Sequence, residues 1–323
     1  MSDAPRAAGD NLSADIEDNS FKSTTAHLRF QAYALLMLII PALFLSSSIP
    51  IVRSKSFPAE SGDPFLLNPD YAFSLKHVDC EVVIYGDSTA LTGLDPTVVS
   101  RATGFKTCNI AQARSIVGIL GMLALDTYLR NNVPPKYIVM QFAPETLSGS
   151  KSNFFWPEGL TLLLRKKSLF EALPTFIRHP VEAYHFSIWA IKARVASFIK
   201  PPIDFASTEA IFRSRGGLLI LPKFAETHCL NDIAYVQPTV DWVHSLKEQY
   251  SRNGTRVVIN VSPLPTCSPI AALVAAGTRN VTDNSLSLYP IGLFCDLDRH
   301  LTIEGAERAS LELAEQLLAG TRP

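Results

Sequence analysis

Short apolar segments that alternate with helical segments most constrain the fold of this chain of 323 residues. The segment "KYIVMQFAP", residues 136–144, is apolar almost throughout, as expected of a strand buried on both faces of a parallel sheet. Strands are expected at residues 81–86, 105–110, 136–144, 255–263 and 287–294. Helices are expected at residues 96–102, 115–132, 239–254, 270–276 and 302–320. This alternation predicts an α/β fold, a central parallel sheet of about five strands with helices on both faces.

The N-terminal region is expected to lie outside this domain. Residues 1–30 are polar and are predicted to form a disordered cytoplasmic tail. Residues 31–52 are predicted to be a transmembrane anchor, because the run from 32 to 52 carries no charge and about 20 apolar residues span a bilayer core. A cleavable signal peptide is the alternative. Residues 53–78 are predicted to be a linker to a domain at 79–323, which would lie in the periplasm or outside the cell.

Charge and cysteine content narrow the function classes. The chain has 29 Lys and Arg against 30 Asp and Glu, so electrostatics gives no reason to expect nucleic acid as a partner. Cys80 and Cys108 each precede a predicted strand, so neighbouring parallel strands could bring them within disulfide distance. Buried thiols are an equally good interpretation of these residues. Cys229, Cys267 and Cys295 show no spacing typical of a zinc or redox site.

Residues 151–215 interrupt the β-α alternation. This segment is aromatic and helical in period, and it contains the basic run Arg165-Lys166-Lys167. A helical insertion over the sheet is the favoured interpretation. A lid, or a surface that touches the membrane or a membrane partner, is the alternative.

Ser88 is the first candidate for chemistry. The stretch "VVIYGDS", residues 82–88, carries a predicted strand into Gly86-Asp87-Ser88. Ligands of open α/β sheets bind beyond the carboxyl ends of the strands. A serine there can attack a carbonyl carbon while its own amide helps to hold the oxyanion. The alternative is that Ser88 only caps the next helix, because Asp and Ser are ordinary helix caps.

A base and its acceptor follow far down the chain, in "FCDLDRHLTIEGAERAS", residues 294–310. A serine nucleophile needs a base, and the base needs an acceptor that fixes its tautomer, roles that His300 and Asp298 can fill. A metal site built from Asp296, Asp298 and His300 is a weaker alternative. A glycosidase using the two aspartates is disfavoured by their proximity, and phosphoryl transfer by the lack of a glycine-rich loop.

Two of these blocks, "YGDS" and "DRHLTIEGA", resemble those of the SGNH (GDSL-type) hydrolase superfamily, a similarity that covers residues 79–323. The resemblance implies a flavodoxin-like three-layer α/β/α fold, Ser88 as nucleophile, His300 as base and no cofactor or metal. Asp298, two residues before the histidine, is similar to the arrangement in bacterial polysaccharide O-acetyltransferases of the alginate type.

The middle blocks depart from the family pattern. "CNIAQARS" keeps Asn109 but has Arg114 where the family has an oxyanion-hole glycine. "QFAPETL" has Pro144 and Glu145 where the family has an asparagine side chain. Losing one oxyanion donor costs about 10²–10³ in rate, so the expectation is a slow or specialised enzyme.

The expected function is therefore an extracytoplasmic esterase or O-acyltransferase, anchored in the inner membrane, that acts on acyl esters of a cell-surface or secreted polysaccharide. Its partners would be an acyl donor, a glycan and a multi-pass membrane acyl-donor protein. The alternative is a catalytically degenerate subunit for carbohydrate binding or assembly. In that case Arg114 and Glu145 would bind ligand or form a salt bridge that closes the oxyanion hole.

Overall fold

A parallel sheet forms the centre of the molecule. The computed structural model describes residues 11–149, 157–199, 211, 213–217, 228–229, 235–296 and 300–320. In this part of the chain the sheet has four strands in the order β2-β1-β3-β4. The strands are β1 (Val82–Gly86), β2 (Thr107–Asn109), β3 (Tyr137–Phe142) and β4 (Arg256–Val261). All neighbouring pairs are parallel, as the apolar segments predicted.

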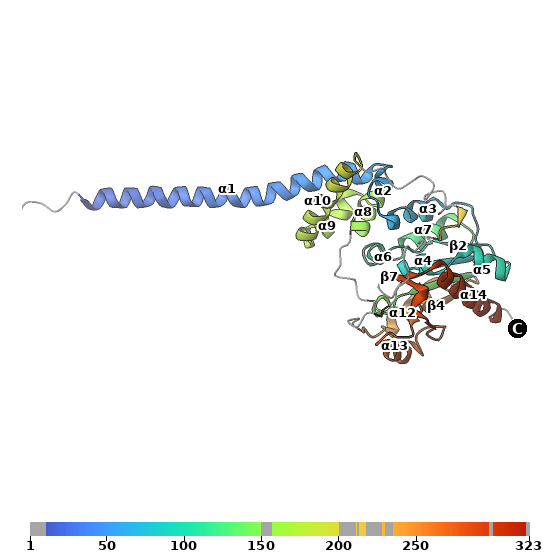
Figure 1. Ribbon diagram of the computed structural model, residues 1–323. Coiled ribbons are helices and arrows are strands. Elements are labelled where there is room, and N and C mark those ends of the chain that lie inside the picture. The colour runs from blue at the N-terminus through green and yellow to red at the C-terminus, as the bar shows by residue number, and fades with distance from the viewer. Residues whose placement is uncertain are drawn as a thin grey trace, which may run out of the picture.

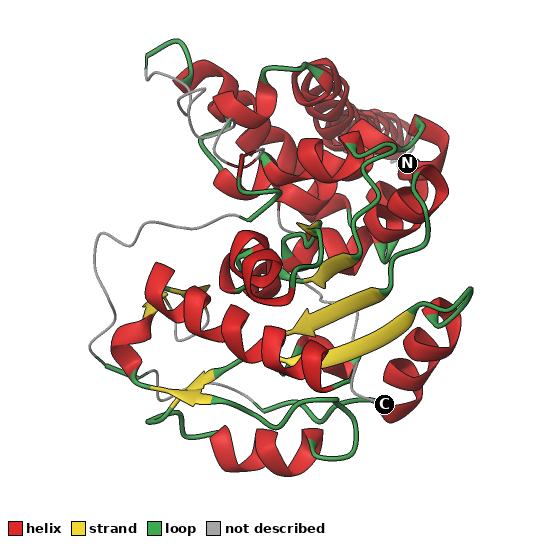
Figure 2. Ribbon diagram, turned by 90° about the vertical axis from the view of Figure 1, so that its right-hand side faces the viewer, coloured by secondary structure: helices red, strands yellow, loops and turns green. Residues whose placement is uncertain are grey.

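Helices cover both faces of this sheet (Figure 2). Alternate strand residues point to opposite sides, so Val83 and Tyr85 lie in one hydrophobic core and Val82 and Ile84 in the other. The first core is covered by α3 (Asn68–Ser74), α7 (Leu123–Asn131), α12 (Val240–Tyr250) and α13 (Ala271–Thr278). The second is covered by α4 (Ser88–Gly93), α5 (Pro96–Thr103) and α14 (Ile303–Ala319). The predicted α/β architecture is confirmed.

The expected fifth strand does not join the sheet. It forms β6 (Leu288–Tyr289), which pairs with β5 (Leu264–Pro265) in a separate two-stranded sheet. The edge of β4 is covered instead by Asp283, whose amide donates to Ile259 O at 2.7 Å and whose Oδ2 accepts from Ile259 N at 2.7 Å. Asn284 uses its side chain for both of its bonds: Oδ1 accepts from Val261 N and Nδ2 donates to Val261 O, each at 3.0 Å. These groups occupy the pairing sites of the edge strand, so no fifth strand is added there.

A further hydrophobic core lies beside the sheet domain. It joins the end of α1 (Asn11–Arg53) to the expected insertion, and it includes the buried side chains of Val52, Leu164 and Phe186. The helices of this part are α2 (Phe57–Glu60), α8 (Pro157–Lys166), α9 (Leu169–Arg178) and α10 (Pro180–Ala196). Figure 1 shows α1 projecting from this group of helices, away from the sheet. Over the residues that the structure describes, no helix has the length and apolar character needed to cross a membrane.

Two N-terminal segments differ from expectation. Residues 11–30, expected to be disordered, belong to α1, and the sequence has no Gly or Pro from 11 to 40 to interrupt that helix. Residues 53–78, expected to be a linker, contain α2, η1 (Pro64–Leu66) and α3, and Tyr71 of α3 lies in the core of the sheet domain.

The ends of α1 and α8 cap each other. The guanidinium of Arg53 donates to Leu164 O at 2.9 Å and to Lys167 O at 3.2 Å. In the opposite direction, the guanidinium of Arg165 donates to Val52 O at 3.1 Å and to Ser54 O at 2.6 Å. Each arginine thus satisfies carbonyls that the other helix leaves unpaired at its C-terminal end.

Two disulfides are present. Cys80–Cys108 joins the segment entering β1 to the middle of β2, with Cα atoms 6.0 Å apart, so the interpretation as a disulfide is confirmed for this pair. Cys229–Cys267 is the second, which the sequence did not indicate. The Cys295 thiol donates to His300 O at 3.3 Å.

Gly86 ends β1 at a close approach of two backbones, which gives a testable prediction. Its φ is +150°, and a Cβ there would lie 1.9 Å from Gln141 O of β3. Gly86→Ala is therefore expected to lower the free energy of unfolding by well over about 1 kcal/mol in urea titrations, because β1 and β3 must separate. Gly104→Ala is the control, since that glycine has φ +76° but open space around its Cβ position. Equal losses for both variants would contradict the proposed clash.

Candidate functional site

Ser88 follows β1 directly and is the first residue of α4, but it does not cap that helix. The N-cap is Asp87, whose Oδ1 accepts from the amide of Thr89 at 2.9 Å and from its hydroxyl at 2.6 Å. The other carboxylate oxygen, Oδ2, accepts from Ala143 N at 2.9 Å, just after β3. Ser88 is half-buried, and its hydroxyl makes no hydrogen bond within the described part of the chain. The capping role that competed with chemistry therefore belongs to its neighbour.

His300 lies on an element that packs against α4. It begins β8 (His300–Leu301), which pairs antiparallel with β7 (Phe294–Asp296) after η3 (Ile291–Leu293). Strand β8 contacts α4, and Leu301 shares a core with Leu91. The His300 ring centroid is 5.7 Å from that of Phe65. The structure thus brings together the elements that carry Ser88 and His300, while Asp298 lies outside the described residues.

The side chain of Asn109 forms hydrogen bonds with backbone groups. Its amide nitrogen donates to Ala90 O and Leu94 O, both at 3.0 Å, and its side-chain oxygen accepts from Ala111 N at 3.0 Å. The side chain is fully buried. Asn109 therefore fastens α4 to the segment after β2 and does not offer its amide to a ligand in this structure.

Arg114 and Glu145 form an ion pair. Arg114 begins α6 (Arg114–Leu120), Glu145 precedes η2 (Thr146–Ser148), and Arg114 Nη1 lies 3.2 Å from Glu145 Oε1. The side chains are 33% and 13% exposed. Partial burial lowers the pKa of the Arg114 guanidinium, and the nearby carboxylate of Asp87 acts in the opposite direction. A cation therefore lies close to the residue that precedes Ser88.

A cavity of about 350 Å³ opens beside Arg114. Gly118, Gly121, Thr146 and Trp242 are among the residues that line it. The Trp242 ring is held against Phe142 with centroids 5.5 Å apart. Arg114 and Trp242 therefore line the same cavity.

Two carboxyl groups close to this region, buried Glu158 and half-buried Asp63, were not indicated by the sequence. Glu158, at the start of α8, accepts from the Ser115 hydroxyl at 3.1 Å and is hydrogen-bonded to Asp63. Burial and the charge of Asp63 raise the pKa of Glu158 from 4.5 to about 7, and burial also raises the pKa of Asp63. Asp63 Oδ1 accepts from the amide of Phe65, whose ring contacts His300. No local pattern connects two acids so far apart in the sequence.

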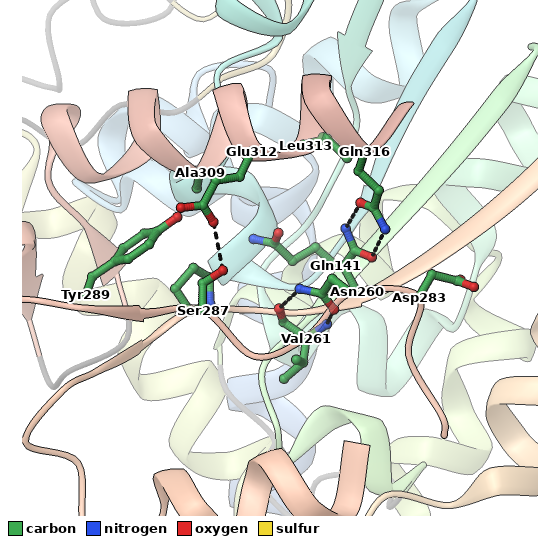
Figure 3. A pocket seen from close by; sticks show the side chains of 12 residues that line it. Gln141, Asn260, Val261, Asp283, Ser287, Tyr289, Ala309, Glu312, Leu313 and Gln316 are labelled. Atoms are coloured by element: carbon green, nitrogen blue, oxygen red, sulfur yellow. Dashed lines mark hydrogen bonds between the residues drawn. The ribbon is translucent and has the colours of Figure 1, made fainter. Parts of the chain in front are cut away.

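A second, more polar cavity of about 240 Å³ lies between β4 and α14 (Figure 3). Figure 3 shows Asn260 and Gln316 joined by two hydrogen bonds, of 2.8 and 3.2 Å, and the Ser287 hydroxyl donating to Glu312 at 2.7 Å. These groups satisfy one another. These hydrogen bonds join α14 to β4 and to Ser287.

The alternative of a metal site gains no support from the geometry. Asp296 and His300 lie opposite each other on two antiparallel strands instead of along one strand. In the described ranges no group of three or more His, Cys, Asp or Glu residues could hold a metal ion. Comparisons with family models, with curated proteins and with solved structures found no match for this chain.

Replacing Asn109 tests its structural role. Asn109→Asp keeps the acceptor for Ala111 N but turns a carboxylate oxygen toward the carbonyls of Ala90 and Leu94. We expect the free energy of unfolding to fall by about 2 kcal/mol or more, since buried acceptors lose their donor. The exposed Asn280→Asp controls for the added charge alone. Unchanged stability of the Asn109 variant would contradict this structural role.

The raised pKa of Glu158 predicts that the stability of the fold depends on pH. The folded protein keeps this proton up to about pH 7, whereas the unfolded chain releases it near 4.5. Stability is therefore expected to fall as pH rises between these values. Glu158→Gln has no carboxyl group to ionise at this position, so its stability should not fall in this way. Between about pH 4.5 and pH 7, the melting temperature of the wild type should drop several degrees relative to that of Glu158→Gln. The exposed Glu307→Gln is the control. Parallel melting curves for Glu158→Gln and wild type would refute a buried protonated carboxyl.

Proposed function

We propose that the chain is an SGNH-type serine esterase or O-acyltransferase. The observation that carries the proposal is the position of Ser88. It follows the carboxyl end of β1, Asp87 takes over the capping of α4, and β8 with His300 packs on that helix. Strand ends of open α/β sheets are the usual sites of chemistry. The strand order β2-β1-β3-β4 is also consistent with a flavodoxin-like sheet.

In this reaction Ser88 Oγ attacks the carbonyl carbon of an acyl ester while His300 takes its proton. Asp298 orients the imidazole, and the amides of Ser88 and Arg114 stabilise the tetrahedral oxyanion. The alcohol leaves with the proton from His300, and an acyl-enzyme remains. Water then makes the protein an esterase, whereas a sugar hydroxyl makes it a transferase.

The substrate class and the compartment follow from other features. The cavity beside Arg114 is within the range of about 300–1,000 Å³ typical of ligand pockets, and Trp242 offers an aromatic wall, which supports an acylated polysaccharide as substrate. Two disulfides support an oxidising compartment such as the periplasm. The uncharged run 32–52 lies in α1 with Leu35, Leu36 and Leu43 exposed, which supports an anchor in the inner membrane. A multi-pass membrane protein would supply the acyl group.

A second candidate function rests on the Arg114–Glu145 ion pair. If this pair closes the oxyanion hole, the domain is a non-catalytic carbohydrate-binding or assembly subunit of a polysaccharide modification complex. The amide of Ala143 is already bonded to Asp87, and Pro144 has no N–H, so neither backbone position after β3 supplies a replacement donor.

Labelling with a fluorophosphonate tests the proposal. The full chain in detergent micelles is the right material, because Val52 and Phe57 are buried in the core that joins α1 to the insertion. We expect one adduct, on Ser88, by intact mass and peptide mapping. It should be absent in Ser88→Ala and form about 10²–10⁴-fold more slowly in His300→Gln, which lacks the base.

The control is Ser262→Ala, which removes a serine from the end of β4 in the same sheet and should label like the wild type. Folded wild-type protein without an adduct would reject the enzyme. Labelling of Arg114→Gly but not of the wild type would identify the ion pair as the block and favour the binding subunit.

A further inference from the structure

Helix α9 is apolar on two sides, and only one of them is covered. Ala172 and Phe176 point into the core shared with α1. On another side Phe170, Leu173 and Ile177 are 89%, 48% and 68% exposed. Their spacing of three and four residues places them in one stripe. Val181, in the first turn of α10, is exposed as well.

Helix α10, which follows α9, lies beside the uncharged run of α1. Helix α10 runs parallel to α1, since Tyr184 contacts Phe44, Ser187 lies near Ser48, and both pairs advance in the same direction. The first half of α10 is therefore level with the last part of the run that ends at Val52. The exposed part of the run, which includes Ile40 and Leu43, therefore lies level with the corner between α9 and α10, whereas Ser48 and Val52 are buried in the domain. In Figure 1 both helices lie where α1 leaves the domain.

The charge around the stripe fits an anionic surface. The helices α8 to α10 carry an excess of cations in a chain whose net charge is -1. Of their basic residues, Arg165, Lys167 and Arg194 pair with Asp70, Glu171 and Glu60, which leaves Lys166, Arg178 and Lys192 against Glu182 on these helices. Glu158 is buried, and an open cavity is lined by Arg53, Arg165, Lys166 and Lys167. An amphipathic helix with exposed large apolar residues and basic neighbours is typical of helices that lie in the membrane interface.

We propose that the α9–α10 hairpin inserts its apolar stripe into the interfacial layer of a bilayer containing anionic phospholipids, with the basic residues of α8 to α10 near the phosphates. This surface is separate from the chemistry proposed for Ser88 and shares with the proposed function only the membrane anchor. The apolar area that the stripe buries adds to the membrane affinity supplied by α1. The stripe also determines which side of the domain faces the lipid.

Site-directed nitroxide labels on the full chain test this surface. The background is Cys295→Ser, in which a hydroxyl can keep the bond to His300 O, and the disulfides protect the other cysteines. Labels replace Phe170 and Leu173. The matched control is Leu273, 53% exposed on α13, which Figure 1 places on the far side of the domain. A label at Leu36 reports separately on α1.

The protein is reconstituted in vesicles of phosphatidylcholine mixed with phosphatidylglycerol. Accessibility to lipid-soluble oxygen is compared with accessibility to a water-soluble nickel chelate. We expect the ratio at positions 170 and 173 to exceed that at 273 several-fold, and to fall in vesicles of phosphatidylcholine alone.

The labelled positions distinguish the stripe from the anchor. Ratios at 170 and 173 equal to that at 273 overturn the proposal, whatever position 36 reports. A water-like ratio at position 36 rejects the anchor, while the chemistry at Ser88 is tested separately by fluorophosphonate labelling. Protection of 170 and 173 from both reagents means that protein covers the stripe, which also overturns the proposal. Equal ratios in the two kinds of vesicle overturn the assignment to an anionic surface.

Discussion

The buried carboxylate of Asp87 organises the candidate site. A charge in a protein interior is tolerated only when hydrogen bonds and opposite charge replace water. Here Thr89 and Ala143 supply three hydrogen bonds, and Arg114 supplies a nearby cation. The same carboxylate therefore caps the start of α4 and holds the segment that follows β3. Because Asp87 is the cap, the hydroxyl of Ser88 is not used for capping. The carboxylate also occupies the amide of Ala143, so the oxyanion donors of the proposed enzyme would come from α4 and α6.

The sequence predicted what depends on local pattern and missed what depends on distant side chains. Strands β1, β3 and β4 could be predicted because strands buried on both faces are mostly apolar. Whether Asp87 or Ser88 caps α4 could not, because both are good caps and only the contact with Ala143 decides. The edge of β4 was missed because Asp283 and Asn284 cover it with side chains, which leave no strand pattern.

The Arg114–Glu145 pair allows both candidate functions for a physical reason. With the arginine side chain 33% exposed, water screens the attraction, and pairs of this kind contribute about 0–1 kcal/mol. A ligand that brings its own hydrogen-bond acceptor can therefore compete with Glu145 for the guanidinium. In the proposed enzyme the pair would be a closed state that a ligand opens at low energetic cost, and in the proposed binding subunit it would close the oxyanion hole permanently.

The reciprocal capping of Arg53 and Arg165 has a mechanical consequence. A helix joined to a domain through a loose segment acts as a tether, and the domain then samples many orientations. Here the carbonyls at the end of α1 are held by α8, and those of α8 by α1, so the two helices turn together. Rotation or tilt of α1 is transmitted to the insertion and through it to the sheet. The orientation of α1 therefore sets the direction in which the carboxyl ends of the strands face. The domain moves with this helix as a rigid body.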